Sequence, residues 1–256
     1  MKPPSQPYDG GFVAESHLAA SSPDHIHPWG TKRCNGSNPR FVTKVCNLFP
    51  KSQVPAILDL GCAGGKMVMD FHDAGCFAHG IEGSDYSQRT QRAEWKHDLD
   101  ILHTADIGKP FRFDRRFDII TLWEVVEHLN QGTLAGLVDN LENNLKAGGM
   151  VIISTTSGPD WIDGVNLHQT MWPKEKWVKY FANGLLYHQP KVVDYFNHQW
   201  VRGRNETKDG FHLCLTKTPA WPTLPKESLA VRIYDRWYGS KIQHVIAGTA
   251  LTEALQ

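Results

Sequence analysis

The feature that most constrains this chain is a glycine-rich turn that follows a short apolar run. Residues 57–60 read Ile-Leu-Asp-Leu, which is typical of a buried strand, and Gly61, Gly64 and Gly65 come next, before a helical pattern resumes. Glycine allows positive φ and a close approach of a ligand to the backbone, while free N–H groups at the start of the next helix face that ligand. The segment predicts a small-molecule cradle, and a plain βα connection in a doubly wound sheet is the alternative.

The spacing of the glycines distinguishes this turn from two common nucleotide-binding loops. A P-loop ends in Lys followed by Ser or Thr, whereas Met67 follows Lys66 here. The dinucleotide fingerprint G-x-G-x-x-G needs a second glycine at position 63, which is Ala63. The segment instead resembles the first motif of class I S-adenosylmethionine-dependent methyltransferases: an acid, an apolar residue, Gly, any residue, Gly or Ala, any residue, Gly. The residues at the four defining places are Asp59, Gly61, Ala63 and Gly65.

Apolar runs with strand character recur along the chain and alternate with helical patterns. We expect strands over 57–60, 77–82, 101–104, 117–123, 150–155, 192–196 and 211–215. We expect helices from Asn38-Pro39, over 66–74, from Ser84 through Trp95, over 134–145 and over 172–181. Residues 54 to about 156 carry the family resemblance. It implies an α/β fold, with a Rossmann-like, seven-stranded, mostly parallel sheet, helices on both faces and an antiparallel last strand.

Length and composition fit one principal domain with appendages. A chain of 256 residues that is 41% hydrophobic is long enough for one substantial α/β domain. Residues 1–38 are rich in Pro, Ser, Gly and His and are predicted to form a flexible arm or lid; 39–218 are predicted to form the methyltransferase domain. Residues 219–256 are predicted to form a linker and then a helix over 229–246. We expect this helix to dock either on the domain surface or on a second subunit of a homodimer.

The net charge and the cysteine pattern indicate which binding partners and which cellular compartment to expect. Lys plus Arg and Asp plus Glu both number 27, so no global field attracts duplex nucleic acid or an anionic membrane. The five cysteines form no CxxC pair, which favours a reducing compartment. No window of about 18 apolar residues is present, so we expect no membrane span and a cytoplasmic location.

The strand ends supply the predicted cofactor contacts. Glu82 ends the second strand, 21 residues after Gly61, where an acid accepts both ribose hydroxyls of an adenosine. The family resemblance implies that Asp106 hydrogen-bonds the adenine amine and that Ile107 flanks the ring. The predicted S-adenosylmethionine site consists of Asp59, Gly61, Gly65, Glu82, Gly83, Asp106, Ile107 and Trp123.

The acceptor is predicted to be a hydroxyl group of a small molecule or a glycan. No Asn-Pro-Pro-Tyr or Asp-Pro-Pro-Tyr follows the fourth strand, and no Pro-Cys nucleophile is present. Residues 167–170 and 172–177 resemble segments of bacterial and viral methyltransferases that modify surface sugars. Trp29, Trp161 and Trp172 could stack on sugar faces or pack in the core or lid. Methylation of an RNA 2′-hydroxyl, a nucleotide-sugar or dinucleotide oxidoreductase, and a non-catalytic partner module are the alternatives.

A hydroxyl is a weak acid, so its methylation needs a general base or a metal. Glu124, Glu127 and His128 stand at i, i+3 and i+4, so a helical turn would place them on one face. This Glu-x-x-Glu-His arrangement is similar to that of ubiquinone-pathway O-methyltransferases and small-RNA 2′-O-methyltransferases. There a histidine beyond the fifth strand can complete the site, and His168 matches it. We expect Glu124, Glu127, His128 and His168 to bind Mg²⁺ or another divalent metal; His168 as a metal-free base is the alternative, with Glu124 and His128 beside it.

Overall fold

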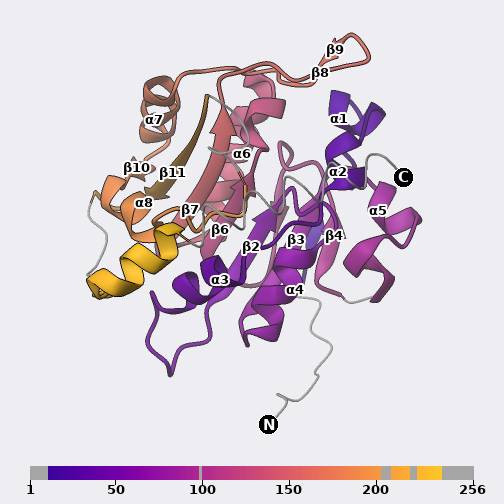
Figure 1. The fold of residues 1–256 in the computed structure, drawn as a ribbon. Helices are drawn as coiled ribbons and strands as arrows, with labels where there is room; N and C mark the ends of the chain where they lie inside the picture. Colours follow the sequence, from indigo (N-terminus) through magenta and orange to yellow (C-terminus); the bar gives the residue numbers. More distant parts are fainter. Residues whose placement is uncertain (1–10, 98–99, 203–208, 220–223, 238–256) are drawn as a thin grey trace.

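A computed structural model describes residues 11–97, 100–202, 209–219 and 224–237 of the chain (Figure 1). The strands are β1 (Val13–Ala14), β2 (Ala56–Leu60), β3 (Phe77–Glu82), β4 (Leu102–Thr104), β5 (Phe111–Arg112), β6 (Phe117–Trp123), β7 (Leu145–Thr156), β8 (Trp161–Ile162), β9 (Val165–Asn166), β10 (Tyr187–His188) and β11 (Gly210–Thr216). The helices are α1 (Pro23–Ile26), α2 (Trp29–Arg33), α3 (Pro39–Cys46), α4 (Lys66–Asp73), α5 (Tyr86–Arg89), α6 (Gln131–Asn144), α7 (Lys174–Asn183), α8 (Pro190–Phe196) and the 3₁₀ helices η1 (Ala93–His97) and η2 (Val126–His128).

Seven strands form one central sheet in the order β10-β11-β7-β6-β2-β3-β4. The five strands from β7 to β4 run parallel, and β11 runs antiparallel to β7. The predicted α/β class, with its mostly parallel seven-stranded sheet and antiparallel last strand, is confirmed. The chain leaves β2 towards β3 on one side and later returns to β6 on the other side. This reversal opens a crevice at the carboxyl ends of the strands, where ligands bind in such sheets.

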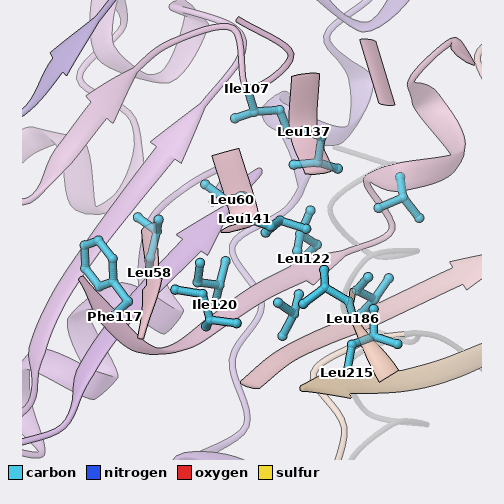
Figure 2. Packing of buried hydrophobic residues seen from close by; sticks show 14 of the residues in the cluster. Leu58, Leu60, Ile107, Phe117, Ile120, Leu122, Leu137, Leu141, Leu186 and Leu215 are labelled. Atoms are coloured by element: carbon cyan, nitrogen blue, oxygen red, sulfur yellow. The ribbon is translucent and has the colours of Figure 1, made fainter. Parts of the chain in front are cut away.

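Alternation along the strands builds two separate hydrophobic cores. Leu58 and Ile120 face one core together with Leu137 of α6 (Figure 2). That core also holds aromatic side chains of α7. Ile57 faces the other core with Phe41 of α3, together with side chains of α4 and α8. The sheet is therefore covered by α6 and α7 on one face and by α3, α4 and α8 on the other. The predicted helices on both faces are confirmed.

The strand predicted over 192–196 is wrong, because this segment lies in helix α8. Pro190 occupies the first turn, where a missing N–H costs nothing. Val192, Tyr195 and Phe196 are the buried residues, and their spacing is that of one helical face rather than of a strand. The place at the sheet edge is taken instead by the short strand β10, which pairs with β11.

The single helix predicted from Ser84 through Trp95 is also wrong. The segment forms a short α-helix, α5, and the separate 3₁₀ helix η1. Gln91, between the two helices, and Ala93, the first residue of η1, both have φ of 51°, and this left-handed conformation interrupts a right-handed helix. The Ser84 hydroxyl nevertheless accepts a hydrogen bond from the Tyr86 N–H at 3.3 Å.

Two small antiparallel pairs lie outside the predicted elements. β1 pairs with β5 and thereby attaches part of the N-terminal segment to the domain. β8 and β9 form a hairpin beyond the end of β7 (Figure 1). β7 itself begins at Leu145, earlier than the predicted 150–155, and its pairing with β6 is irregular between Phe117 and Ile119.

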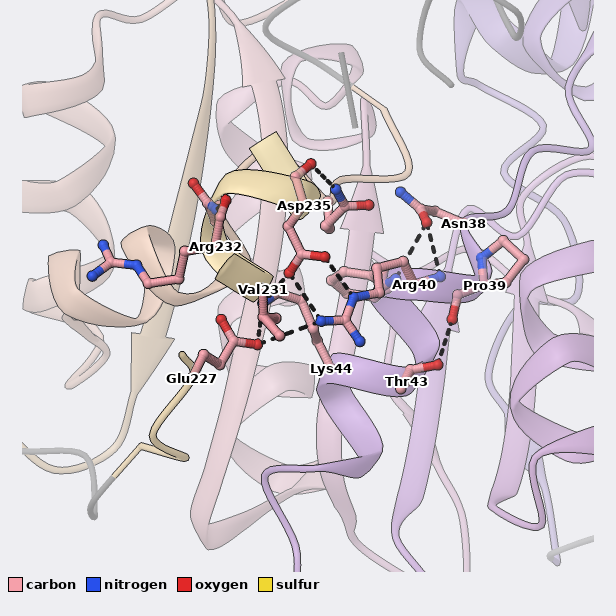
Figure 3. A network of polar contacts seen from close by, with 12 residues as sticks. Asn38, Pro39, Arg40, Thr43, Lys44, Glu227, Val231, Arg232 and Asp235 are labelled. Carbon is pink, nitrogen blue, oxygen red and sulfur yellow. Dashed lines mark hydrogen bonds and ion pairs between the residues drawn. The ribbon is translucent and has the colours of Figure 1, made fainter. Parts of the chain in front are cut away.

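A C-terminal helix lies against α3. Residues 229–237 are helical, and the remainder of the predicted 229–246 lies outside the described residues. Lys44 of α3 is fully buried, and its Nζ lies 2.9 Å from Asp235 Oδ2 and 2.5 Å from Glu227 Oε1 (Figure 3). Arg40 donates two hydrogen bonds to Asp235, at 2.8 and 3.0 Å. Four charged side chains thus fix this helix to the sheet domain.

Among the described residues, no helix has both the length and the apolar character needed to cross a membrane.

Candidate active site

A cavity of about 1360 Å³ opens at the carboxyl ends of the central strands. This volume exceeds the roughly 300–1,000 Å³ of common small-molecule pockets, so it has room for two ligands side by side. The predicted site residues that line it are Gly61, Glu82, Gly83, Asp106, Ile107, Trp123, Glu124, His128 and His168. Residues far apart in the sequence are therefore brought together around one space.

The glycine turn has the backbone that its sequence predicts. Gly61 has φ of +80°, and a Cβ there would lie 2.4 Å from Val125 Cγ2. Gly65 has φ of +88° and stands at the N-cap of α4, where a Cβ would lie 2.7 Å from a methyl group of Leu102. Only Gly61 of these two lines the cavity. We infer that Gly65 serves the turn through its conformation and close packing.

Glu82 is held in place by hydrogen bonds at the edge of the cavity. Its Oε1 accepts from the Thr31 hydroxyl at 3.1 Å and from the Ser84 N–H at 3.3 Å. Its Oε2 accepts from the Ala63 N–H at 2.7 Å. Burial raises the pKa of Glu82, although these three bonds oppose the rise. A carboxylate oxygen can accept two hydrogen bonds, so Oε2 retains an acceptor position for a ligand hydroxyl.

Asp59 does not line the cavity. It is buried beneath the glycine turn, where Oδ1 accepts from the Thr121 hydroxyl at 2.7 Å. Burial raises the pKa of Asp59 to about 7. Asp106 does reach the cavity, and its Oδ1 accepts from the Gly108 N–H at 2.9 Å, which fixes the carboxylate beside Ile107.

A compact cluster of three potential ligands lies beyond the strand ends. Side-chain ligand atoms of Glu127, His128 and His168 lie within 4.8 Å of one another. His128 Nδ1 lies 2.8 Å from Asp24 Oδ2, and His168 Nδ1 lies 2.6 Å from the Gly158 carbonyl oxygen. Asp24 therefore contacts the His128 ring at Nδ1 as an ion pair, and the Gly158 carbonyl contacts the His168 ring at Nδ1, which leaves Nε2 of His168 for a ligand.

Glu127 is fully buried at the base of this cluster. Its Oε2 accepts from the Thr155 hydroxyl at 3.0 Å, whereas Oε1 has no hydrogen-bond partner among the described residues. Burial, followed by the charge of Glu124, raises the pKa of Glu127 to about 8. A buried carboxylate oxygen without a donor is costly, and a bound cation would satisfy it.

The predicted single helical face through Glu124, Glu127 and His128 is wrong. Glu124 has φ of 53° and precedes η2, which begins at Val126. The left-handed backbone ends β6, and the Glu124 N–H bonds back to Ser154 at the end of β7. The side chain lines the cavity with a buried Oε1 that lacks a partner among the described residues, but Glu124 is not part of the three-residue cluster.

The pKa values of the two imidazoles in the cluster are shifted in opposite directions. Burial lowers the pKa of His128, but the hydrogen bond and charge of Asp24 outweigh it and raise that pKa to about 9. Burial lowers the pKa of His168 below its usual value, and the charge of His128 adds to this effect. At neutral pH, His168 is therefore the neutral imidazole of the pair.

Sequence reasoning gave no role to Asp24 or Thr31, although both lie in residues 1–38, which were predicted to form an arm or lid. Both lie in residues 19–36, here named the cover segment, which crosses the cavity. Thr31 contacts Glu82 at the strand end, and Asp24 contacts His128 beyond it. The available signal was the Ser22-Pro23-Asp24 sequence, in which Ser22 caps the short helix α1.

The three tryptophans proposed for stacking occupy different environments. Trp29 lines the cavity, with the Arg33 guanidinium 4.3 Å from its ring centroid. Trp161 is 64% exposed on the β8–β9 hairpin. Trp172 packs against Trp177 and Tyr180, at centroid distances of 4.9 and 5.2 Å. Trp29 is thus the only member of this trio that lines the described cavity.

Comparison with known proteins agrees with this arrangement. A family described as "Methyltransferase domain" matches residues 37–201. The fold is similar to that of a TehB-like SAM-dependent methyltransferase from Corynebacterium glutamicum, with 15% identity, 78% of this chain and 99% of that chain covered, and a TM-score of 0.52. It is also similar to the glycopeptide N-methyltransferase MtfA in complex with S-adenosyl-L-homocysteine, with 14% identity, coverage of 72% and 92%, and a TM-score of 0.50.

A search of curated protein sequences returns no match to the chain. The fold and the family match define the class of protein: the chain belongs to the methyltransferase domain family and is a class I S-adenosylmethionine-dependent methyltransferase.

Proposed function

We propose that this enzyme transfers the methyl group of S-adenosylmethionine to a hydroxyl group of a small molecule or a glycan. The observation that carries the proposal is the division of one cavity into two chemically different ends. Gly61 and Glu82 lie at the ends of β2 and β3, whereas His128 and His168 follow the neighbouring strands β6 and β7 on the other side of the strand order. We name these two sides of the cavity its donor end and its acceptor end; Trp123 and Glu124 also line it. A donor held at the first end presents its methyl group to an acceptor at the second.

At the donor end, Glu82 accepts the ribose hydroxyls and the backbone at Gly61 and Gly83 lies against the cofactor. Asp106 accepts from the adenine amine, and Ile107 packs on the ring. The bound S-adenosyl-L-homocysteine in the similar MtfA structure supports this choice of cofactor. Family membership favours methyl transfer over the oxidoreductase and the non-catalytic alternatives.

The acceptor end is rich in groups that accept hydrogen bonds from hydroxyls. Asp24, Glu124, Asp160 and Asp209 line the cavity together with His168. Carboxylates of this kind fit a polyhydroxylated acceptor better than a polyanionic one, because they would repel phosphates. This argument favours a sugar-like acceptor over RNA.

We further propose that Glu127, His128 and His168 hold a divalent metal. The donor set fits such an ion: a carboxyl oxygen of Glu127 lies within 4.8 Å of the ligand atoms of two imidazoles, and Glu127 Oε1 has no partner among the described residues. Binding of the ion would displace the protons that the raised pKa values place on Glu127 and His128, because metal ligands must be deprotonated. A metal bound there would lower the pKa of the acceptor hydroxyl. Two imidazoles suit a transition metal better than Mg²⁺.

The chain can also act without a metal. His168 is neutral at pH 7 because burial lowers its pKa, so its Nε2 can accept the proton of the acceptor hydroxyl. Glu124, whose carboxylate lines the same wall, would then hold the acceptor in place.

Calorimetry with S-adenosylhomocysteine tests the donor site. We expect binding to the wild-type chain, loss of at least about tenfold in affinity for Glu82→Ala, and no change for Glu175→Ala, which is an exposed residue of α7. NAD serves as the negative control, and we expect it not to bind. Absence of binding to the wild-type chain would sink the cofactor assignment, and unchanged binding by Glu82→Ala would sink the ribose role.

A panel of sugars, small alcohols, amines and RNA, assayed with radiolabelled cofactor, tests the acceptor. We expect transfer to hydroxyls of sugars or small molecules; preferred transfer to protein amines or RNA would overturn the proposed acceptor.

Removal of divalent metal tests the proposed metal site. Dialysis against EDTA should abolish turnover, and Mn²⁺ or Mg²⁺ should restore it. Glu127→Ala should then be as inactive as His168→Ala. Full activity in EDTA leaves only His168 as a general base.

We also infer that the C-terminal helix contributes to a homodimer. Leu229 and Ile233, one helical turn apart on it, are 72% and 60% exposed. Sedimentation over a range of concentrations tests the inference, and a monomer at every concentration would contradict it. The cytoplasmic location stays a prediction from the sequence.

A further inference from the structure

Two thiols lie close together at the C-terminal ends of α3 and α4. Cys46 is the last residue of α3, and Cys76 follows the end of α4 by three residues. Their sulfur atoms are 3.6 Å apart, and one thiol hydrogen-bonds the other. Neither residue lines the cavity, so the methyl-transfer site does not account for this pair.

The surrounding structure fixes the two thiols relative to each other. Gly75, with φ of +86°, turns the chain after α4, and the Cys76 N–H donates to the Phe71 carbonyl at 3.0 Å. Phe71 and Phe41 of α3 are both fully buried, and their rings meet edge-on at 6.3 Å. The two helix ends are therefore joined through the hydrophobic core, which leaves the sulfur atoms facing each other.

The two sulfurs differ in access to solvent and in acidity. Cys76 is 6% exposed, whereas Cys46 is half-buried and can be reached from solvent. The hydrogen bond from Cys76 lowers the pKa of Cys46 to about 7, and this effect outweighs the opposing effect of burial. Cys46 therefore supplies a thiolate near neutral pH, and Cys76 is the thiol beside it.

We propose that Cys46 and Cys76 form a redox site, which small-molecule disulfides such as oxidised glutathione convert into an intramolecular disulfide. Closing the bond requires the sulfurs to approach from 3.6 Å to about 2.05 Å. Cys46 lies at the end of α3, and a turn begins at the C-cap residue Asn47, so we expect the backbone to adjust there.

The exchange takes place in two balanced steps. The Cys46 thiolate attacks one sulfur of glutathione disulfide, forms a mixed disulfide and releases one glutathione thiolate. Cys76 then loses its proton to solvent and attacks Cys46 Sγ, which releases the second glutathione. Counted from the two thiols, the protein loses two electrons and two protons, one from Cys46 when it ionises and one from Cys76. The two released glutathione thiolates take up two protons from solvent, so one glutathione disulfide becomes two glutathione thiols.

The new disulfide would stabilise the part of the fold that forms the donor end of the cavity. Residues 46–76 form the closed loop, and this loop contains β2, the glycine turn and α4. A disulfide that closes a loop of this length restricts the unfolded chain, and for a domain of this size the midpoint of thermal unfolding should rise by about 5 °C or more. Dithiothreitol should reverse the rise.

Intact-mass measurement and peptide mapping of the full chain, treated with oxidised glutathione, test the proposal. The wild-type chain should lose two hydrogen atoms in mass and yield a peptide that joins Cys46 to Cys76. Cys76→Ser should instead accumulate one glutathione on Cys46, and Cys46→Ser should form neither product. Cys34→Ser is the matched control, since Cys34 is also half-buried, and it should keep the disulfide.

Three results would overturn the proposal: no loss of mass under these conditions, a disulfide between other cysteines, or equal yields in Cys46→Ser and the wild-type chain. Should a serine variant fail to fold, peptide mapping of the wild-type and Cys34→Ser chains decides the matter alone. None of these readouts depends on methyl transfer, so the redox site and the proposed function can fail separately.

Discussion

Asp59 is an acid buried beneath the glycine turn, and its burial makes the stability of the fold depend on pH. Its unfolded pKa is about 3.9, and burial raises the folded pKa to about 7. Between these values the folded chain keeps a proton that the unfolded chain has released. The free energy of unfolding therefore falls as pH rises from about 4 to about 7.

We expect Asp59→Asn to remove this dependence on pH. Relative to the wild-type chain, the variant should gain about 2–4 kcal/mol in free energy of unfolding between pH 4 and pH 8. Urea unfolding at both pH values measures the change. Asp73→Asn, at a side chain that is 71% exposed, is the control. Parallel curves for Asp59→Asn and the wild-type chain would show that the buried carboxyl is not the cause.

Asp24 is expected to position His128 for catalysis. The two lie 2.8 Å apart, and removing the carboxylate frees the imidazole to rotate. Asp24→Ala should lower kcat by about tenfold or more, while its affinity for S-adenosylhomocysteine stays within twofold of the wild type. Asp24→Glu should recover part of the activity. Ile26→Ala on the same helix, at a 66% exposed residue, serves as the control. An equal loss of affinity and kcat would point to a general disturbance of the fold.

At the residue scale, local spacing predicted that Gly61 and Glu82 lie beside one cavity. Gly61 and Glu82 follow from the order of strand, turn and strand. The contact of Asp24 with His128 depends on how the cover segment crosses the cavity, which no local pattern encodes. Glu124 was placed on a helical face because spacing cannot reveal a left-handed residue between a strand and a 3₁₀ helix.

At the element scale, the C-terminal helix depends on a buried charge. Asp235→Ala would leave Lys44 fully buried with one carboxylate fewer. We expect a loss of about 2–4 kcal/mol in free energy of unfolding, measured by urea denaturation. Arg236→Ala, an exposed position on the same helix, should change it by less than about 0.5 kcal/mol. A neutral Asp235→Ala would show that the helix adds nothing to stability.

Elements with strong periodicity were predictable, and short ones were not. The central strands are apolar runs buried on both faces, so β2, β3, β6 and most of β7 follow from the sequence. The segment 192–196 contains two adjacent valines, which favour a strand, but its buried side chains occupy one face of α8. Two-residue pairs such as β8 and β9 leave no periodic signal at all.

At the scale of the whole molecule, cofactor and fold should stabilise each other. The cofactor contacts β2, β3, β6 and the cover segment under the proposed function, so binding should oppose unfolding of the entire domain. At a concentration about 100 times its Kd, S-adenosylhomocysteine should raise the midpoint of thermal unfolding by roughly 5–10 °C. Differential scanning calorimetry measures the shift, with NAD as the control ligand. An equal shift with NAD would contradict a specific donor site.

The cover segment contacts both ends of the cavity, through Thr31 at Glu82 and through Asp24 at His128. Under the proposed function, the same segment therefore lies beside both the donor and the acceptor, and we expect its contacts to loosen when either product leaves. Release, rather than chemistry, should then set the pace of turnover. Rapid-quench experiments should show a burst of methylated product equal to the enzyme concentration, followed by a slower steady rate.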